Sequence, residues 1–529
     1  MKIGLGCGTS TARRMRHALA ALAVAACGAS PRAADTLVFA SGTDLEGANP
    51  LATIHPLSRQ VQRFVLFTTL VRWDSTLTAQ PYLARRWEWS TDRTLLTMHL
   101  ATNVPWQDGV PTTARDAAFT LEAARDPATG YARASDLASL AHATAANDST
   151  LVLQWSVPQP ALPPILCELP IVPDHVLGRV PHAELKRAEF NRAPVGNGPW
   201  RFIERVAGQR WIFERNERFP AELGGPPKMR RMVIAVVDEP TTKFAGLASG
   251  ELDFAGISPT SASLAARDPS LRVIDYPVLI STALIFNTQR APFDDVRARR
   301  AVAMSIDRAR IISAALAGYG TVAGGPVPPE NPLALRDSLV RNTSLADSLL
   351  DAAGWPRGAG GVRARNGKPF AIELLAVVSG DNAVEQLVQA DLRDRGITLA
   401  VKPVEMGAFL SRARATHKDF DLLITGIPGD LSLSYLSAMF ATSQRGGALD
   451  YSGYHTTHLD SLLARTRQAT SREQLIGAWA DVQRDLLANV PATWLYHSRG
   501  LQGVSARLQH VRLDLRGELA TSSRWTVAP

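Results

Sequence analysis

The chain has 529 residues, of which 46% are hydrophobic and 20% are charged, and this composition excludes a disordered protein. The formal net charge of +8 raises the question of nucleic-acid binding. Four of the basic residues lie in the first 27 positions, however, and the other arginines are interleaved with Asp and Glu, without a basic run spaced by aromatic residues. The charge pattern therefore predicts a solvated surface and no nucleic-acid partner.

The amino-terminal segment has the pattern of a secretory leader. Residues 13–27 read RRMRHALAALAVAAC, in which a basic patch precedes a short apolar run. The run is too short to span a bilayer and is typical of a signal peptide, which we place at residues 1–26. The stretch that ends at Cys27 resembles a bacterial lipobox, in which this cysteine becomes the acylated lipid anchor; the alternative is an ordinary signal peptide cleaved near Ala33 and Ala34. The leader predicts a location in the periplasm or at the cell surface. If Cys27 is acylated, the protein is a membrane-anchored lipoprotein there.

Hydrophobic periodicity predicts the elements of the first half of the mature chain. They are, in order, a strand at 35–40, a helix at 60–70, a hairpin over 83–100, a helix at 113–125, a strand at 151–157, and a second hairpin made of 200–206 and 210–214. Thr112 or Thr113 is the expected N-cap of the helix at 113–125, with Asp116 in its first turn.

From residue 232 onward, strands and helices alternate. Strands are predicted at 232–237, 252–257, 370–377, 397–404 and 420–427, and helices at 239–249, 291–317, 344–353, 382–395, 406–415 and 459–490. Alternation of this kind implies parallel sheets with helices packed on their faces. The predicted fold class is α/β.

Several segments, taken in order, resemble one known family. They are LARRWEWSTDRTLLTMHLATNVPWQDGVPTTARDAAFTLE (83–122), PVGNGPWRFIE (194–204), DEPTTKFAGLASGELDFAGI (238–257), IFNTQRAPFDDVRARRAVAMSIDRARII (285–312), SLLDAAGW (348–355) and YHTTHLDSLL (454–463). Together they resemble the bacterial extracellular solute-binding proteins of family 5, which serve peptide and nickel ABC importers. The likeness covers nearly the whole mature chain.

The resemblance implies a two-lobed periplasmic binding protein-like fold of type II, in the large cluster, with an extra α+β domain inserted in the first lobe. The first lobe would comprise residues 35–80, 195–285 and 491–529, the inserted domain 81–194, and the second lobe 286–490. The chain would then cross between lobes twice, and two crossings make a hinge that can close over a ligand.

The motifs that carry the resemblance have ordinary physical explanations. Asp294 and Asp295 precede a predicted helix and would cap its N–H groups. Asp108 and Gly109 would make a tight turn, and the glycines of PVGNGPW would allow positive φ. These residues are expected to hold the fold and not to contact ligand.

The function that the resemblance implies is that of the extracytoplasmic substrate-binding component of an ABC importer, which captures peptides and delivers them to a permease. In peptide-binding members, the aspartate of a Gly-Trp-x-x-Asp segment takes the peptide's α-amino group, and Asp430 matches that aspartate when counted from Gly426. Two departures are present: Ile427 replaces the tryptophan, and Leu433-Ser434 lies where Asp-Pro usually follows. Asp430 is therefore either an amine-binding residue or a loop aspartate that faces solvent.

Other ligand contacts are expected from the family loop after the first strand and from aromatic walls. The expected residues are Ser41, Gly42 and Thr43 in the loop and Tyr435 and Trp494 on the walls; Trp106 is a further wall candidate for which core packing is favoured. A ligand carboxylate would need an arginine, but the sequence does not select one. Open alternatives are a nickel chelate, haem or another small solute as ligand, or a ligand sensor without transport.

An enzyme, a cofactor and a resident metal are not predicted. The mature chain has no G-x-S-x-G, H-E-x-x-H or Walker motif, and its one cysteine besides Cys27, Cys167, lies in an apolar stretch between prolines, where a buried inert thiol is expected. His455 and His458 are three residues apart, a spacing that would put both on one helix face, but a plain helix start is favoured there over a metal site. The chain is expected to act as a monomer.

Overall fold

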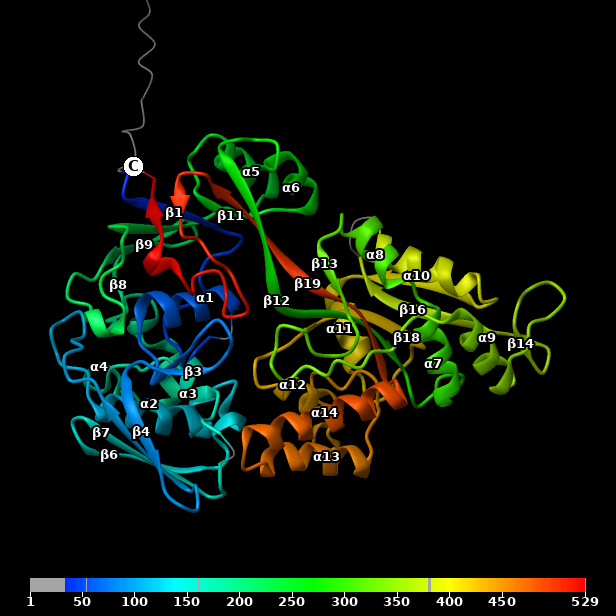
Figure 1. The fold of residues 1–529 in the computed structure, drawn as a ribbon, viewed down its shortest axis with the longest axis horizontal. Helices are drawn as coiled ribbons and strands as arrows, with labels where there is room; N and C mark the ends of the chain where they lie inside the picture. Colours follow the sequence, from blue (N-terminus) through cyan, green and yellow to red (C-terminus); the bar gives the residue numbers. More distant parts are fainter. Residues whose placement is uncertain (1–33, 54, 160, 379–381, 529) are drawn as a thin grey trace, which may run out of the picture. The chain divides into compact units, whose positions relative to one another are not determined.

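The computed structural model of the chain describes residues 34–53, 55–159, 161–378 and 382–528 (Figure 1). The predicted signal peptide and Cys27 lie outside the described residues. None of the helices in the described ranges is long and apolar enough to cross a membrane. The predicted lobe and domain boundaries remain predictions.

The described residues form one large mixed sheet of eleven strands. Its order is β17-β16-β18-β12-β19-β11-β1-β10-β9-β8, with β13 (Gly320–Val322) paired to β19. The bounds are β1 (Thr36–Ser41), β8 (Trp200–Val206), β9 (Arg210–Arg215), β10 (Arg231–Val236), β11 (Phe254–Gly256), β12 (Leu271–Phe286), β16 (Ala371–Val377), β17 (Thr398–Val404), β18 (Leu422–Pro428) and β19 (Ala492–Ser505).

The sheet is parallel only in part. Strand β1 pairs in parallel with β10 and β11, and β16 pairs in parallel with β17 and β18, as the strand–helix alternation predicts. Strands β12 and β19 pair antiparallel with each other and with their neighbours β18 and β11. The prediction of parallel sheets was therefore wrong for the strands that join the two parallel groups.

The two joining strands run side by side (Figure 1). Their register begins at Leu271 opposite Ser505 and ends at Ile285 opposite Ala492. It is irregular at two places, between Pro277 and Ser281 and directly after Thr282. The predicted crossings, near 285–288 and 490–494, include the last residues of β12 and the first residues of β19, with residues 287–288 and 490–491 outside these strands.

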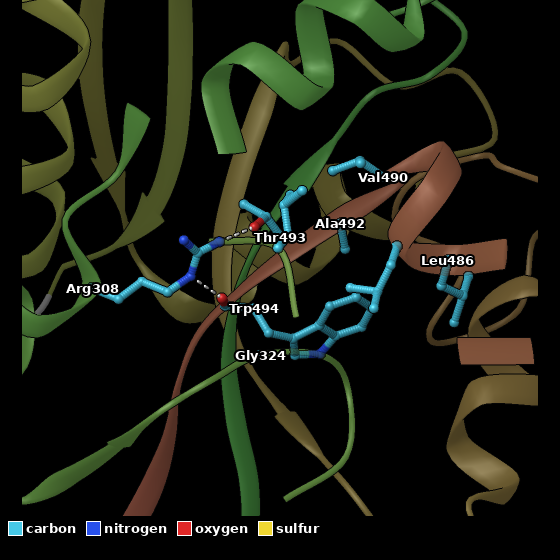
Figure 2. Close-up of a pocket in the computed structure, with 9 residues that line it drawn as sticks. Arg308, Gly324, Leu486, Val490, Ala492, Thr493 and Trp494 are labelled. Atoms are coloured by element: carbon cyan, nitrogen blue, oxygen red, sulfur yellow. Dashed lines mark hydrogen bonds between the residues drawn. The ribbon is translucent and has the colours of Figure 1, made fainter. Parts of the chain in front are cut away.

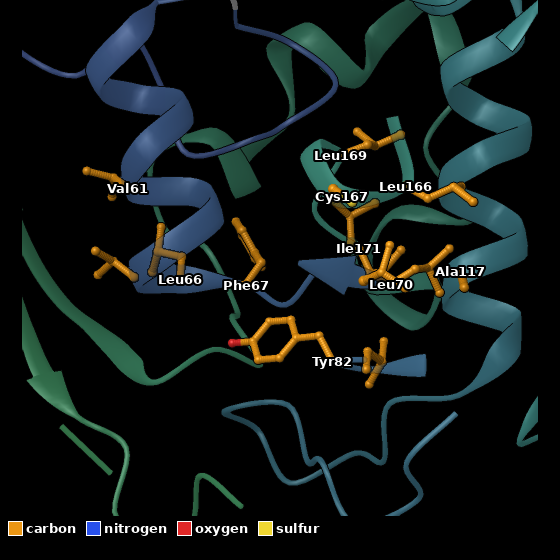
Figure 3. Close-up of a cluster of buried hydrophobic side chains, with 14 of the residues drawn as sticks. Val61, Leu66, Phe67, Leu70, Tyr82, Ala117, Leu166, Cys167, Leu169 and Ile171 are labelled. Carbon is orange, nitrogen blue, oxygen red and sulfur yellow. The ribbon is translucent and has the colours of Figure 1, made fainter. Parts of the chain in front are cut away.

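Strand β1 shows how the period-two pattern builds the first core. Leu37 and Phe39 point into a large hydrophobic cluster, and the alternate residues Val38 and Ala40 pack in a second cluster beneath α5 (Pro240–Ala248) and α6 (Pro259–Ala265). Figure 3 shows part of the large cluster, in which Phe67 and Tyr82 lie near the Cys167 segment.

The large cluster continues into the four-stranded antiparallel sheet β4-β5-β7-β6, which falls within the predicted inserted domain. This sheet and the helices around it comprise β4 (Ala84–Trp89), β5 (Leu95–Leu100), α2 (Ala114–Arg125), β6 (Leu140–Asn147), β7 (Thr150–Trp155), α3 (Ile165–Glu168) and α4 (Asp174–Leu177). Thr113 is the N-cap of α2 and forms a capping box with Asp116. The predicted hairpin at 83–100 is confirmed.

The second parallel group is covered by helices on both faces. Leu284 and Phe286 of β12 face one cluster, and Ala283 and Ile285 face the other. The first cluster holds α7 (Val296–Ser305), α9 (Thr343–Ala352) and α10 (Ala383–Arg393), and the second holds α11 (Met406–Arg414), α12 (Ser434–Phe440), α13 (Thr457–Gln468) and α14 (Arg472–Asn489). Helix α8 (Arg308–Ala315) follows α7. Of the two aspartates before α7, Asp295 is its N-cap.

The glycines of PVGNGPW have a different purpose from the predicted one. Neither Gly196 nor Gly198 has a positive φ. Instead, a Cβ atom at Gly196 would lie 2.3 Å from the carbonyl oxygen of Leu66, and one at Gly198 would lie 2.6 Å from its carbonyl carbon. The prediction of positive φ was wrong, because close approach of two backbone segments is what requires glycine here.

The same contact corrects the predicted helix at 60–70. Helix α1 (Pro56–Val61) continues as a π-helical segment, η1 (Gln62–Leu66), and ends there. The N–H of Gly198 donates to the carbonyl of Leu66 at 2.8 Å, and the N–H of Thr68 donates to the side chain of Asn197 at 2.8 Å. These tertiary partners take the groups that a longer helix would use.

Candidate functional site

Asp430 lies in the loop between β18 and α12, and its carboxylate is held by that loop. Oδ1 accepts hydrogen bonds from the N–H of Ser432 at 2.8 Å, its hydroxyl at 2.6 Å and the N–H of Ser434 at 3.0 Å. Oδ2 accepts from the Ser434 hydroxyl at 2.7 Å and from the N–H of Tyr435 at 3.0 Å. A carboxylate has about four lone-pair sites, so a ligand ammonium would replace one of the serine bonds.

The predicted aromatic wall residues are buried in this structure. Tyr435 is 6% exposed and its hydroxyl donates to the carbonyl of Pro326 at 2.8 Å; burial raises the pKa of this hydroxyl. Trp494 is 2% exposed, and its Nε1 has no hydrogen-bond partner within the described ranges. Trp106 packs against Phe67 in the core, as favoured. A wall role for Tyr435 and Trp494 stays a prediction.

Figure 2 shows the small cavity beside Trp494. Arg308 reaches in from α8, where its Nε donates to the carbonyl of Trp494 at 2.8 Å and a terminal nitrogen donates to the hydroxyl of Thr493 at 2.6 Å. Burial lowers the pKa of Arg308 to about 10. The cavity has a volume of about 10 Å³, which is the space of roughly one water molecule, so it does not hold a solute.

The loop after β1 is held by its own polar groups. The hydroxyl of Ser41 donates to the carbonyl of Thr43, and the N–H of Thr43 is 3.2 Å from that hydroxyl. The Thr43 hydroxyl lies 3.1 Å from Nε2 of His55. Gly42 sits beside Lys243 of α5, whose ammonium would be 3.2 Å from an added Cβ. A ligand role for Ser41, Gly42 and Thr43 stays a prediction.

A second cavity, of about 50 Å³, lies farther along the same loop. We call it the arginine pocket; its lining residues are Pro50, Thr53, Arg59, Gln62, Tyr131, Arg133, Glu168, Leu169 and Pro170. Sequence reasoning missed it, because Arg59, Arg133 and Glu168 belong to segments that are far apart along the chain and carry no shared motif.

An ion network forms one wall of the arginine pocket. Arg133 binds Glu168 with one terminal nitrogen and Asp136 through Nε at 2.8 Å. Burial would raise the pKa of Glu168, but the surrounding guanidinium groups outweigh it and hold this pKa below its ordinary value. They are those of Arg133, Arg63 and Arg59.

The charge of Asp430 also affects the pKa of Asp136 in this network. Burial raises the pKa of Asp136, Arg133 opposes that rise, and the negative charge of Asp430 adds to it.

The two histidines do not form a pair. Helix α13 begins at Thr457, so His455 precedes it and only His458 is helical. His455 is buried with Nε2 3.1 Å from Asp450, whereas His458 is exposed and lies 3.8 Å from Asp485. Within the described residues no group of three or more His, Cys, Asp or Glu is placed to hold a metal ion. Burial raises the pKa of the Cys167 thiol, which lies in the core.

The architecture defines the class of protein: two parallel sheet groups with helices on their faces, joined by two long antiparallel strands, make the fold of type II periplasmic binding proteins. The family profile described as "Bacterial extracellular solute-binding proteins, family 5 Middle" matches residues 78–447. The chain belongs to this family of solute-binding proteins.

Curated relatives agree with the family. Over 464 residues the chain is 27% identical to Protein XP55 of Streptomyces lividans, which covers 87% of this chain and 83% of the relative. Over 373 residues it is 26% identical to the oligopeptide-binding protein AppA of Bacillus subtilis, which covers 68% and 67%.

Solved structures show the same fold. The structure of AppA from Bacillus subtilis in complex with a nonapeptide matches with a TM-score of 0.74 and 24% identity, covering 93% of this chain and 99% of that one. The substrate-binding protein CtaP from Listeria monocytogenes matches with a TM-score of 0.82 and 18% identity, covering 93% and 99%.

Proposed function

We propose that this chain is the peptide-capturing component of an ABC importer outside the cytoplasm, and that it acts by binding and not by catalysis. The observation that carries the proposal is the family match over residues 78–447. The oligopeptide-binding relative AppA supports peptide as the cargo. Delivery to a permease follows from the importer role.

Capture would proceed by closure of the two lobes around the solute. Strand β12 pairs with β18 of one parallel group, β19 pairs with β11 of the other group, and β12 and β19 pair with each other. Among the described residues, no other named strands connect the two groups within the sheet. Their register is interrupted between Pro277 and Ser281, where ladder hydrogen bonds are fewer. Bending of the pair at this interruption would cost little, which supports a hinge here.

Recognition of a peptide would use Asp430. A buried ammonium needs a carboxylate partner, and Asp430 offers one in the loop that precedes α12. The hydroxyl of either Ser432 or Ser434, both of which bind Asp430, would be displaced by the ligand, since serine hydroxyls rotate readily. The Ser41–Thr43 loop would supply backbone groups to the peptide chain.

The proposed location is the outer side of the cytoplasmic membrane, with residues 1–26 removed and Cys27 acylated. A monomer tethered by lipid is sufficient for a receptor that hands its solute to a membrane permease. Labelling with palmitate tests the tether: the wild-type chain incorporates label and Cys27→Ala does not. Label in Cys27→Ala, or none in the wild type, would contradict the anchor.

A thermal-shift screen of the mature protein tests the cargo. The ligands are di- to pentapeptides, nickel chelates and haem. A ligand at 100 times its Kd stabilises the fold by about 2.7 kcal/mol, which gives a shift of a few degrees. A shift with peptides supports the proposal, and a shift with metal chelates or haem alone overturns the cargo.

Substitution of Asp430 tests amine recognition. We expect Asp430→Asn to weaken binding of a free-amine peptide by about 10- to 100-fold, because a charge-assisted hydrogen bond is lost. The matched control is Asp74→Asn, since Asp74 also holds its own loop by accepting from Thr76 and Thr78. Amine recognition is wrong if N-acetylated peptides bind the wild type as tightly as free ones.

A further inference from the structure

The two sides of the interruption in the β12–β19 ladder belong to different parts of the sheet. Before it, residues 271–277 pair with 499–505, in the part of the ladder that β11 joins. After it, residues 281–285 pair with 492–497, in the part that β18 and β13 join. A contact that connects the two sides without following the strands would therefore resist bending at the interruption.

Arg499 makes such a contact. It lies opposite Pro277, the last paired residue before the interruption. On its own side, its Nε donates to the carboxylate of Asp275, and one of its terminal nitrogens lies 3.5 Å from Oε1 of Glu330. The side chains of Arg499 and Glu330 are 22% and 35% exposed, so water screens this ion pair only in part.

Glu330 belongs to the other side of the interruption. It lies between β13 and α9, in a segment that α14 holds in place. There the side chain of Gln483 accepts from the N–H of Leu335 at 3.0 Å and donates to the carbonyl of Leu333 at 2.8 Å. Leu333 also packs against the hydrophobic cluster that contains α14. The ion pair with Arg499 therefore connects the two sides of the interruption outside the sheet.

The loop between β18 and α12, which carries the candidate amine-binding residue, is attached to the interruption itself. The N–H of Gly429 donates at 2.7 Å to the carbonyl of Leu279, which lies inside the interruption. In the segment that α14 holds, the side-chain nitrogen of Asn331 lies 3.5 Å from the carbonyl oxygen of Leu431. A solute bound at this loop would therefore act on the interruption and on that segment together.

We propose that the ion pair of Arg499 and Glu330 is a latch across the hinge, which stabilises the conformation described here against bending of β12 and β19. This inference rests on the proposed function, in which bending at the interruption changes the separation of the two lobes. An ion pair that exists in only one of two conformations shifts their ratio, and a solute that prefers one of them must act against or with that shift.

The distance between two spin labels, measured by pulsed electron paramagnetic resonance without solute, tests the latch. The labels are attached at Ala207→Cys, in the turn between β8 and β9, and at Ser344→Cys, in α9; both positions are exposed. The background is Cys27→Ala, and Cys167 is buried. We expect Glu330→Gln to change the ratio of the two conformations by about 2- to 5-fold, because partly exposed ion pairs contribute little.

The matched control is Glu373→Gln. Glu373 makes a similarly long contact of 3.8 Å with Lys402, but both residues lie in the same parallel group, so this change should leave the ratio as in the wild type.

Salt provides a second measurement, on the wild type itself, in case a variant does not fold. Raising the ionic strength from about 0.01 M to about 1 M shortens the screening length from about 30 Å to about 3 Å. The wild-type ratio should then change in the same direction as in Glu330→Gln, and the ratio of the variant should change much less.

The inference is overturned if Glu330→Gln has the same distance distribution as the wild type, if Glu373→Gln changes it equally, or if salt leaves the wild-type ratio unchanged. Trialanine and the other peptides of the thermal-shift screen test the proposed function separately. If none of them changes the distance distribution of the labelled wild type, peptide capture by lobe closure is wrong, whatever Glu330→Gln does without solute.

Discussion

A single methyl group added at Gly198 should test whether the close approach of two backbone segments requires glycine at this position. A Cβ atom there would lie 2.6 Å from the carbonyl carbon of Leu66, 2.7 Å from the nitrogen of Phe67 and 2.7 Å from the carbonyl oxygen of Val65. These are backbone atoms of residues that are fully buried. No side-chain rotation relieves the overlap in Gly198→Ala, so one of the two segments must move.

The expected loss of stability follows from three contributions. Overpacking of a core costs about 1–3 kcal/mol. Weakening the hydrogen bond from Gly198 to Leu66 adds about 1 kcal/mol. Restricting the unfolded chain by replacing glycine returns about 0.4–1 kcal/mol. The free energy of unfolding should therefore fall by about 1–3.5 kcal/mol.

Urea unfolding monitored by tryptophan fluorescence measures this change. The control is Gly477→Ala, because Gly477 lies in α14 and an added Cβ would meet no atom within 4 Å. Alanine is the better helix former, so this control should gain up to about 1 kcal/mol. If Gly198→Ala is as stable as the wild type, close backbone approach does not explain the glycine.

Two further predictions concern pH and the end of the chain. Burial lowers the pKa of His497 from 6.5 to about 4, and its Nδ1 lies 2.7 Å from the Ser281 hydroxyl. Because the unfolded chain binds this proton more readily than the folded protein, the free energy of unfolding should fall by about 3 kcal/mol as the pH drops from 6.5 to 4. In urea titrations at each pH, His497→Gln should flatten that decline. An unchanged slope in the variant would contradict the assignment. Trp525 is fully buried, and its ring centroid lies 5.2 Å from that of Phe254, on which it stacks. Trp525→Ala should lower the free energy of unfolding, measured in urea, by about 3–5 kcal/mol. A loss below about 1 kcal/mol would show that the contact is dispensable.

Local chemistry made some elements predictable. Helix α2 begins directly after Thr113, one of the two predicted N-caps, and α5 lies within the predicted 239–249. Strands β12 and β19 were not predicted as long strands, because each is specified by a partner more than 200 residues away: Leu271 lies opposite Ser505. No local periodicity reports such a pairing.

The candidate site was predictable only where a resemblance gave a residue. Asp430 could be selected in this way, but the five bonds that its loop donates could not. Helix α12 was missed because it has seven residues and starts after Leu433, which has a φ of +63°.

The first hydrophobic core draws on both early and late parts of the chain, and this fixes an order of events during synthesis. Leu37 and Phe254 belong to the same cluster as Val504, Leu508 and Trp525. A ribosome that has made residues up to 300 has produced most of that cluster but not its last pieces. The growing chain must therefore keep an unfinished apolar surface until its final residues emerge, which suits a polypeptide that is handed to an export machine before it folds.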